Sequence, residues 1–207
     1  MQRLLDIMRT LRAPDGCPWD QEQTHESLRP HLTEEAAEAV DAIATGDARL
    51  MADELGDVLL QVAFHAVIAE EAGTFAYDDI EGAIVDKLIR RHPHVFADAR
   101  VDGAAGVLST WQAIKAEERS AAGTSGSAGA RVPRSLPALR RAAELDRALE
   151  WEVDPELATR PLAELAADTA SLGAALLHLA QVARRAGLDP ELALRDHLEA
   201  RVGREGP

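Results

Sequence analysis

The sequence has very little cysteine: Cys17 is the only one. An internal disulfide is therefore excluded, and so is a zinc site built from several cysteines. No stretch approaches the roughly 18 uncharged apolar residues that a membrane-spanning helix requires. The first residues, Met1 to Asp6, lack the long apolar run of a signal peptide. We therefore expect a soluble, cytoplasmic protein.

Aromatic residues are also scarce, at 3% of the 207 residues, whereas hydrophobic residues make up 46%. Ala and Leu dominate the apolar set, and both favour helices over strands. No segment shows the alternating apolar and polar pattern of a half-buried strand. Composition and pattern together predict an all-α fold with a substantial core.

The formal net charge is −14. A chain this acidic is not expected to coat nucleic acid or to bind an anionic membrane. Small anionic substrates are compatible with it, because a local basic cluster or a bound metal ion outweighs the global field at short range.

Apolar periodicity and capping signals divide the chain into helices. Two long helices are expected at 27–45 and 49–72, joined by a compact turn at Gly46. Asp20 and Gln23 resemble a capping box. The other expected helices are 3–12, 78–91, 109–120, 136–149, 157–169, 170–186 and 190–202.

Residues 121–135 have the Gly- and Ser-rich composition of a linker. We therefore expect a first domain at 1–120 and a second helical region at 136–207. The run Leu55 to Leu60 resembles the run Leu172 to Leu177, and each precedes a helix, a turn and another helix. The chain is thus interpreted as two diverged copies of one helical unit, although an Ala- and Leu-rich sequence also produces such likeness by chance.

The most informative feature is a set of four carboxylates on the two long helices. Glu35 and Glu38 are three residues apart, as are Glu54 and Asp57, so each pair shares one helix face. Glu38 lies eight residues before Gly46 and Glu54 eight after it; Glu35 and Asp57 lie eleven before and after. In an antiparallel hairpin the four side chains therefore face one another across a single seam.

Four close carboxylates repel one another, and they must take up protons or bind a cation. Oxygen ligands suit Mg²⁺ or Mn²⁺, and Mg²⁺ also binds phosphates. Two other interpretations remain: a solvated acidic face, and a di-iron bundle. The di-iron bundle requires Glu-x-x-His on two helices, whereas only Glu22-x-x-His25 is present.

Several motifs resemble the MazG family of all-α pyrophosphohydrolases. They are Gly16-Cys17-Pro18-Trp19-Asp20, Gln23-Thr24, Glu34-Glu35-x-x-Glu38, Glu54-Leu55-Gly56-Asp57 and Arg91-His92-Pro93-His94-Val95-Phe96. The resemblance covers residues 3–119. Its glutamate motifs are shared with dimeric dUTPases and phosphoribosyl-ATP pyrophosphohydrolases.

The resemblance implies a homodimer of helical bundles that hydrolyses nucleoside triphosphates to monophosphates and pyrophosphate. It implies that Mg²⁺, with Mn²⁺ as a substitute, is held by Glu35, Glu38, Glu54 and Asp57. It also implies that Lys87, Arg91, Trp111 and Lys115 handle the substrate. We expect Glu38 to orient the attacking water, with Glu34 as the second candidate.

The second half departs from this pattern. The positions that correspond to Glu54 and Asp57 are Ser171 and Ala174, so we expect no metal site there. Two other functions stay open: an enzyme specific for dUTP, dCTP or phosphoribosyl-ATP, and a non-catalytic helical dimer that binds nucleotides.

Overall fold

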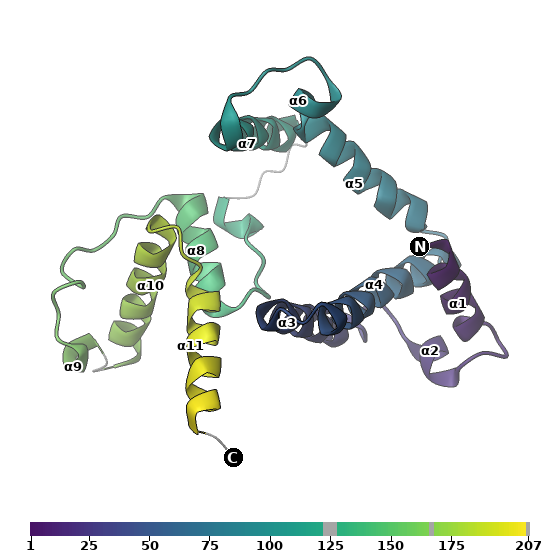
Figure 1. Ribbon diagram of the computed structural model, residues 1–207, viewed down its shortest axis with the longest axis horizontal. Helices are drawn as coiled ribbons and strands as arrows, with labels where there is room; N and C mark the ends of the chain where they lie inside the picture. Colours follow the sequence, from purple (N-terminus) through teal and green to yellow (C-terminus); the bar gives the residue numbers. More distant parts are fainter. Residues whose placement is uncertain (122–127, 166–167, 206–207) are drawn as a thin grey trace. The chain divides into compact units, whose positions relative to one another are not determined.

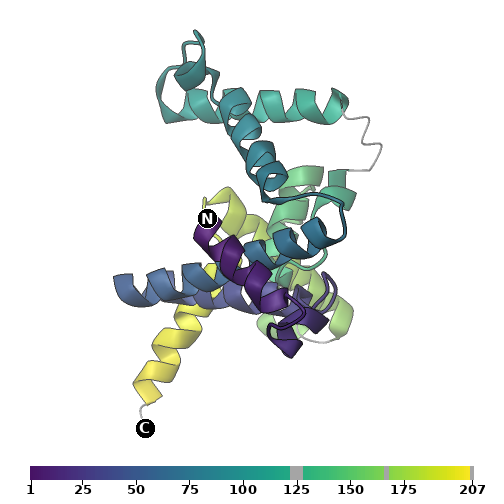
Figure 2. The ribbon, with the colours of Figure 1, turned by 90° about the vertical axis from the view of Figure 1, so that its right-hand side faces the viewer.

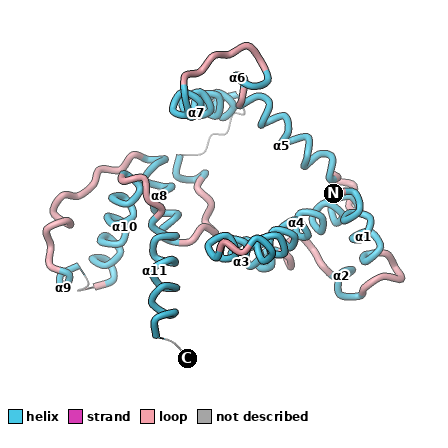
Figure 3. The backbone as a smooth tube through the Cα atoms, in the orientation of Figure 1, coloured by secondary structure: helices cyan, strands magenta, loops and turns pink. Residues whose placement is uncertain are grey.

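In the computed structural model, residues 1–121, 128–165 and 168–205 are described. Within these ranges every regular element is a helix (Figure 3), which confirms the all-α fold. The chain divides into two compact units, Met1–Ala122 and Gly123–Pro207. In the described part of the chain, none of the helices is both long and apolar enough to cross a bilayer.

The first unit is organised around an antiparallel hairpin of two long helices, α3 (Arg29–Thr45) and α4 (Ala48–Glu71). Gly46 adopts a left-handed conformation with φ of 72°, which ends α3 without the steric cost that a side chain would bring. Asp47 then caps α4, because its Oδ1 accepts hydrogen bonds from the backbone N–H groups of Arg49 and Leu50 at 2.8 and 3.2 Å. The predicted turn at Gly46 is confirmed.

The remaining helices of this unit are α1 (Gln2–Arg12), α2 (Pro18–Glu22), α5 (Tyr77–Arg91), α6 (Pro93–Phe96) and α7 (Gly103–Ala121). Helix α1 packs against α4. Helix α5 leads away from the end of α4, and α6 and α7 lie at its far end (Figures 1 and 2). The carboxyl half of α5 and helix α7 therefore form a second region, distinct from the hairpin.

The core of the first unit lies where α1 meets the second half of α4. Its buried residues are Leu5, Met8, Leu28, Ala63, Phe64, Ala66 and Val67. Two ion pairs close the edge of this core: Arg9 with Glu70 at 2.9 Å and Arg12 with Glu71 at 2.7 Å. Packing therefore fixes α1 on the half of α4 that follows the predicted metal ligands.

Three details differ from the sequence-based expectations. Asp20 lies inside α2 and does not cap a helix; Gln23 instead donates to the carbonyl of Trp19. The expected helix 157–169 is wrong for its first residues, because α9 covers only Leu162–Leu165 after Pro161, which lacks an N–H and disfavours a helical residue before it. Helix α7 begins at Gly103, six residues early, because two glycines weaken the helical pattern there.

Two histidines join the segment before α3 to α4. The Nδ1 atoms of His25 and His65 are 2.8 Å apart, and the two rings are stacked with centroids 5.1 Å apart. Phe75 stacks on the ring of His25. One Nδ1 must donate its proton and the other must accept it, so the contact holds only while one ring keeps a free lone pair. Burial, and then the neighbouring His25, lower the pKa of His65.

The stability of the first unit should therefore depend on pH through His65. Because its folded pKa lies below the ordinary value of 6.5, the unfolded chain binds the proton more readily. The free energy of unfolding should thus fall as the pH is lowered from 7.5 to 5.5, and His65→Gln should show a shallower fall. Chemical denaturation at both pH values measures this, with the exposed His197→Gln as control. Equal slopes in His65→Gln and wild type would refute it.

The second unit contains η1 (Ala128–Arg131), α8 (Ala138–Leu149), α9, α10 (Thr169–Arg185) and α11 (Pro190–Glu205). Helix α8 contacts both α10 and α11, and η1 contacts α8. Part of the predicted linker 121–135 thus packs in this unit, while residues 122–127 lie outside the described residues. The predicted helices 170–186 and 190–202 are confirmed as α10 and α11.

Some buried positions of the two units have the same spacing. Matching Leu55 to Leu172 places buried Gln61, Ala63 and Phe64 of α4 on buried His178, Ala180 and Gln181 of α10. The two buried residues of α8, Ala143 and Asp146, are spaced like Leu5 and Met8 of α1. The contact of α1 with α4 therefore has a counterpart in α8 and α10, as expected for diverged copies.

At three matched positions an apolar residue of the first unit corresponds to a polar or charged residue of the second. Asp146, which corresponds to Met8, is fully buried and accepts from Gln181 Nε2 at 2.9 Å and from Arg184 Nε at 2.5 Å. Gln181 and Arg184 correspond to Phe64 and Val67. Burial acts to raise the pKa of Asp146, but the hydrogen bonds from Gln181 and Arg184 outweigh it and hold that pKa below its usual value. A buried ionic network thus replaces the apolar contact of the first unit.

Candidate active site

The carboxylates of the hairpin converge as the register about Gly46 predicts. One oxygen each of Glu35, Glu38 and Glu54 lies within 4.8 Å of the other two. Glu35 and Glu54 are half-buried, and Glu38 is exposed. Asp57 is outside this group of three, but it acts on it electrostatically. The hairpin therefore brings three of the four predicted metal ligands together, with the fourth beside them.

The electrostatics of the cluster reproduce the expected pairing. Burial, and next the charge of Asp57, raise the pKa of Glu35; Glu38, Glu34 and Glu54 add smaller effects. Burial, and next the charge of Glu38, raise the pKa of Glu54. The strongest charge partners are thus the residues at equal distance from Gly46. Carboxylates whose charged forms are this disfavoured are suited to bind a cation.

Glu34 lies beside the cluster on the exposed face of α3. Its Oε2 is 3.7 Å from His31 Nδ1, and the His31 ring makes an edge contact with Trp19. Trp19 also meets the buried Phe64 edge-on. Trp19 thus connects α2 to both helices of the hairpin.

A second cluster lies between the end of α5 and α7. The guanidinium carbon of Arg91 is 5.1 Å from the centre of the Trp111 ring, and Lys115 Nζ is 4.9 Å from it. Both distances are within the range of cation–π attraction. The structure therefore brings together three of the four residues expected to handle the substrate.

Lys87 lies one helical turn before Arg91 on α5 and is half-buried. Lys87 and Lys115 are the only two lysines among the 22 basic residues. A lysine presents a compact charge on a flexible stem, which arginine does not. The two lysines of the chain thus lie on α5 and α7.

Sequence reasoning missed one member of this cluster, Glu118. Its Oε2 accepts hydrogen bonds from Arg91 Nη2 and Nε at 2.6 and 3.1 Å, and its Oε1 accepts one from Arg90 Nε at 2.6 Å. The hydrogen bond from Arg91, and then that from Arg90, lower the pKa of Glu118 to about 2. The available signal was its position seven residues after Trp111 and three after Lys115, on the same helix face.

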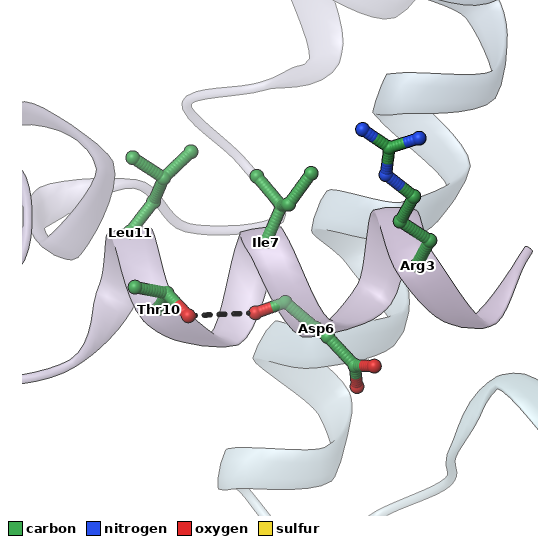
Figure 4. Close-up of a pocket in the computed structure, with 5 residues that line it drawn as sticks. All are labelled: Arg3, Asp6, Ile7, Thr10 and Leu11. Atoms are coloured by element: carbon green, nitrogen blue, oxygen red, sulfur yellow. Dashed lines mark hydrogen bonds between the residues drawn. The ribbon is translucent and has the colours of Figure 1, made fainter.

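A surface pocket elsewhere on the first unit involves none of these residues. It is lined by Arg3, Asp6, Ile7, Thr10 and Leu11, all on α1. Arg3, Ile7 and Leu11 project to one side of the helix, and Thr10 Oγ1 donates to the carbonyl of Asp6 (Figure 4). Its lining contains a single carboxylate, that of Asp6, so it does not offer the group of converging carboxylates that the hairpin has.

Comparisons with known proteins agree with this geometry. Residues 23–96, which include all of α3 and α4, match the MazG nucleotide pyrophosphohydrolase domain. The chain is 50% identical over 148 residues to a nucleoside triphosphate pyrophosphohydrolase of Escherichia coli strain K12, covering 71% of this chain. It is 41% identical over 208 residues to the nucleoside triphosphate pyrophosphohydrolase/pyrophosphatase MazG of Thermotoga maritima, covering 94% of this chain.

The matched region spans 56% of the E. coli protein and 79% of the T. maritima protein. The carboxylate pairs and the cluster around Trp111 both lie inside the first unit, which also contains the residues that match the MazG domain. With this extent of identity along nearly its whole length, the chain belongs to the MazG nucleotide pyrophosphohydrolase family.

Proposed function

We propose that this protein is a Mg²⁺-dependent pyrophosphohydrolase that cleaves nucleoside triphosphates to monophosphates and pyrophosphate. The observation that carries the proposal is the convergence of Glu35, Glu38 and Glu54 across the hairpin. The names of the E. coli and T. maritima relatives support the same activity.

The residues of the hairpin fit a magnesium ion. Carboxylate oxygens are the hard ligands that Mg²⁺ prefers, and Mn²⁺ accepts the same donors. Burial, and then the charges of the neighbouring carboxylates, raise the pKa values of Glu35 and Glu54, and a bound cation would offset both effects. Glu35, Glu38, Glu54 and Asp57 would hold the ion, and a bound Mg²⁺ would neutralise charge on the phosphate oxygens.

The protein's own side chains supply the remaining chemistry. Glu38 is exposed at the cluster, so its carboxylate can accept a hydrogen bond from a water molecule and orient it; Glu34 is the second candidate. Lys87, Arg91 and Lys115 would hold the phosphates of the nucleotide, because cations stabilise the charge of the transferring phosphoryl group. Trp111 would present its ring beside these cations.

We also propose that the active form is a homodimer. The hairpin exposes a set of large apolar side chains, each at least 38% exposed: Leu32, Val40, Ile43, Leu50, Leu55 and Leu59. Exposed large apolar side chains in this number on one helical hairpin favour a protein interface. A second copy of the chain would cover it and extend the hairpin to a helical bundle.

The activity is tested with a panel of standard and modified nucleoside triphosphates, including dUTP and dCTP, and with phosphoribosyl-ATP. Reactions run in heavy-oxygen water identify the bond that breaks. Attack at the α-phosphorus should place the label in the monophosphate, with pyrophosphate as the second product and no diphosphate intermediate. Label in orthophosphate would contradict the mechanism, and inactivity on all substrates would favour a non-catalytic nucleotide-binding dimer.

A further inference from the structure

Glu118 links the two helices that carry the predicted phosphate-binding cations. Each of its oxygens accepts from a different arginine of α5: Oε1 from Arg90 and Oε2 from Arg91. On its own helix, α7, it lies on the same face as Trp111 and Lys115. This one carboxylate therefore fixes the end of α5 against α7.

The pairing with Arg91 is the more protected of the two. The Arg91 side chain is 14% exposed and Glu118 is 22% exposed, whereas Arg90 is 53% exposed. Partly desolvated ion pairs hold their geometry better than exposed ones, which contribute little. Glu118 is ionised throughout the pH range of an enzyme assay, because its pKa is about 2. The position of Arg91 is thus set at any assay pH.

This contact also determines which way the Arg91 guanidinium faces. Its Nε and Nη2 donate to Glu118, and its guanidinium carbon lies over the Trp111 ring, 5.1 Å from the ring centre. Lys115 lies over the same ring. Arg91 and Lys115 are therefore held at set places around Trp111, and Glu118 is the group that holds Arg91.

We infer that Glu118 is a positioning residue: it holds Arg91 against Trp111, so that Arg91 and Lys115 meet the phosphates of a bound nucleoside triphosphate in a preset arrangement. The inference rests on the proposed pyrophosphohydrolase function. Glu118 touches no substrate in this role. Its contribution is to remove the cost of ordering a long arginine side chain when the nucleotide binds.

The experiment compares Glu118→Gln with wild type in steady-state hydrolysis with Mg²⁺. Glutamine keeps the shape of the side chain but loses the charge that orders Arg91. The KM for the nucleotide should rise about ten- to a hundredfold, the range that corresponds to loss of a charge-assisted hydrogen bond, and kcat should change less. Glu118→Asp, which keeps the charge, should recover part of the loss. Glu117→Gln, an equal change at the exposed neighbouring residue, is the matched control and should leave KM unchanged.

A double-mutant cycle with Arg91→Ala separates positioning from other roles. If Glu118 acts through Arg91, the double variant should have a KM little higher than that of Arg91→Ala alone. Thermal melts and Mn²⁺ binding without nucleotide, measured on each variant, report folding and the carboxylate cluster independently. Mn²⁺ affinity should equal that of wild type.

Three results would overturn the inference while leaving the proposed function intact. A lower melting temperature with unchanged KM would make Glu118 a helix-pairing residue only. A lower KM would show that Glu118 competes with phosphate for Arg91. Additive losses in the cycle would show that it acts without Arg91. A wild-type protein that hydrolyses no triphosphate would instead refute the proposed function, and this inference with it.

Discussion

Replacing Glu54 with glutamine is expected to lower Mg²⁺-dependent hydrolysis by about a hundredfold or more, while the helical content stays unchanged. Loss of a residue that hydrogen-bonds to a metal ligand already lowers metal affinity or activity about 10–100-fold. Loss of a ligand itself should lower activity by at least the upper end of that range. Glu54 is one of the three carboxylates that converge within 4.8 Å. Initial rates over a Mg²⁺ titration, together with circular dichroism, measure both parts of the prediction.

Asp53→Asn is the matched control, since it removes a charge from the adjacent exposed residue, and that charge also contributes to the raised pKa of Glu54. It should retain most of the activity. In chelated buffer Glu54→Gln should be at least as stable as wild type, because one member of a repelling cluster has lost its charge. Mg²⁺ should raise the melting temperature of wild type more than that of the variant. Comparable hydrolysis rates for Glu54→Gln and wild type would show that the hairpin carboxylates are not part of the active site.

Replacing Asp146 with asparagine should lower the free energy of unfolding of the second unit by about 3 kcal/mol. The substitution leaves Arg184, which is 24% exposed, without its buried counter-charge, and breaking a buried pair in this way is costly. It also weakens the hydrogen bond from Gln181. Urea denaturation followed by circular dichroism gives the change in free energy.

Asp196→Asn makes the same chemical change at an exposed position of α11 and should alter stability by less than about 0.5 kcal/mol. Because the converging carboxylates belong to the first unit, Asp146→Asn should affect turnover far less than Glu54→Gln when both are assayed below their melting transitions. An Asp146→Asn protein as stable as wild type would show that the buried network contributes nothing to the second unit.

The hairpin and its carboxylate seam were predictable because their geometry is local. Helix periodicity places Glu35 and Glu38 on one face, and a turn at Gly46 sets the register with Glu54 and Asp57. Nothing beyond chain connectivity is needed to bring Glu35, Glu38 and Glu54 together. The pKa effects of Asp57 on Glu35 and of Glu38 on Glu54 follow that register.

The contacts that sequence reasoning missed join residues that no local rule relates. His25 and His65 are 40 positions apart, and Arg91 and Glu118 are 27 apart. Their pairing depends on how a loop and two helices pack, which periodicity does not encode. Asp146 is a clearer case still: an acidic residue in an amphipathic helix indicates a solvated face, yet it is fully buried because Gln181 and Arg184 come to it from α10.

Two helical units with a similar spacing of buried residues carry a folding hazard, because a helix of one unit can dock on the partner meant for the other. The matched positions described above work against that exchange. Helix α8 placed on α4 would bury the charge of Asp146 against Phe64 and Val67, and α1 placed on α10 would leave Gln181 and Arg184 facing Met8. Each mismatched pair of helices would bury a polar or charged group without a partner, which raises the free energy of that pairing by several kcal/mol. The ionic contact of α8 with α10 and the apolar contact of α1 with α4 are thus chemically incompatible with each other's partners, which favours the two native pairings.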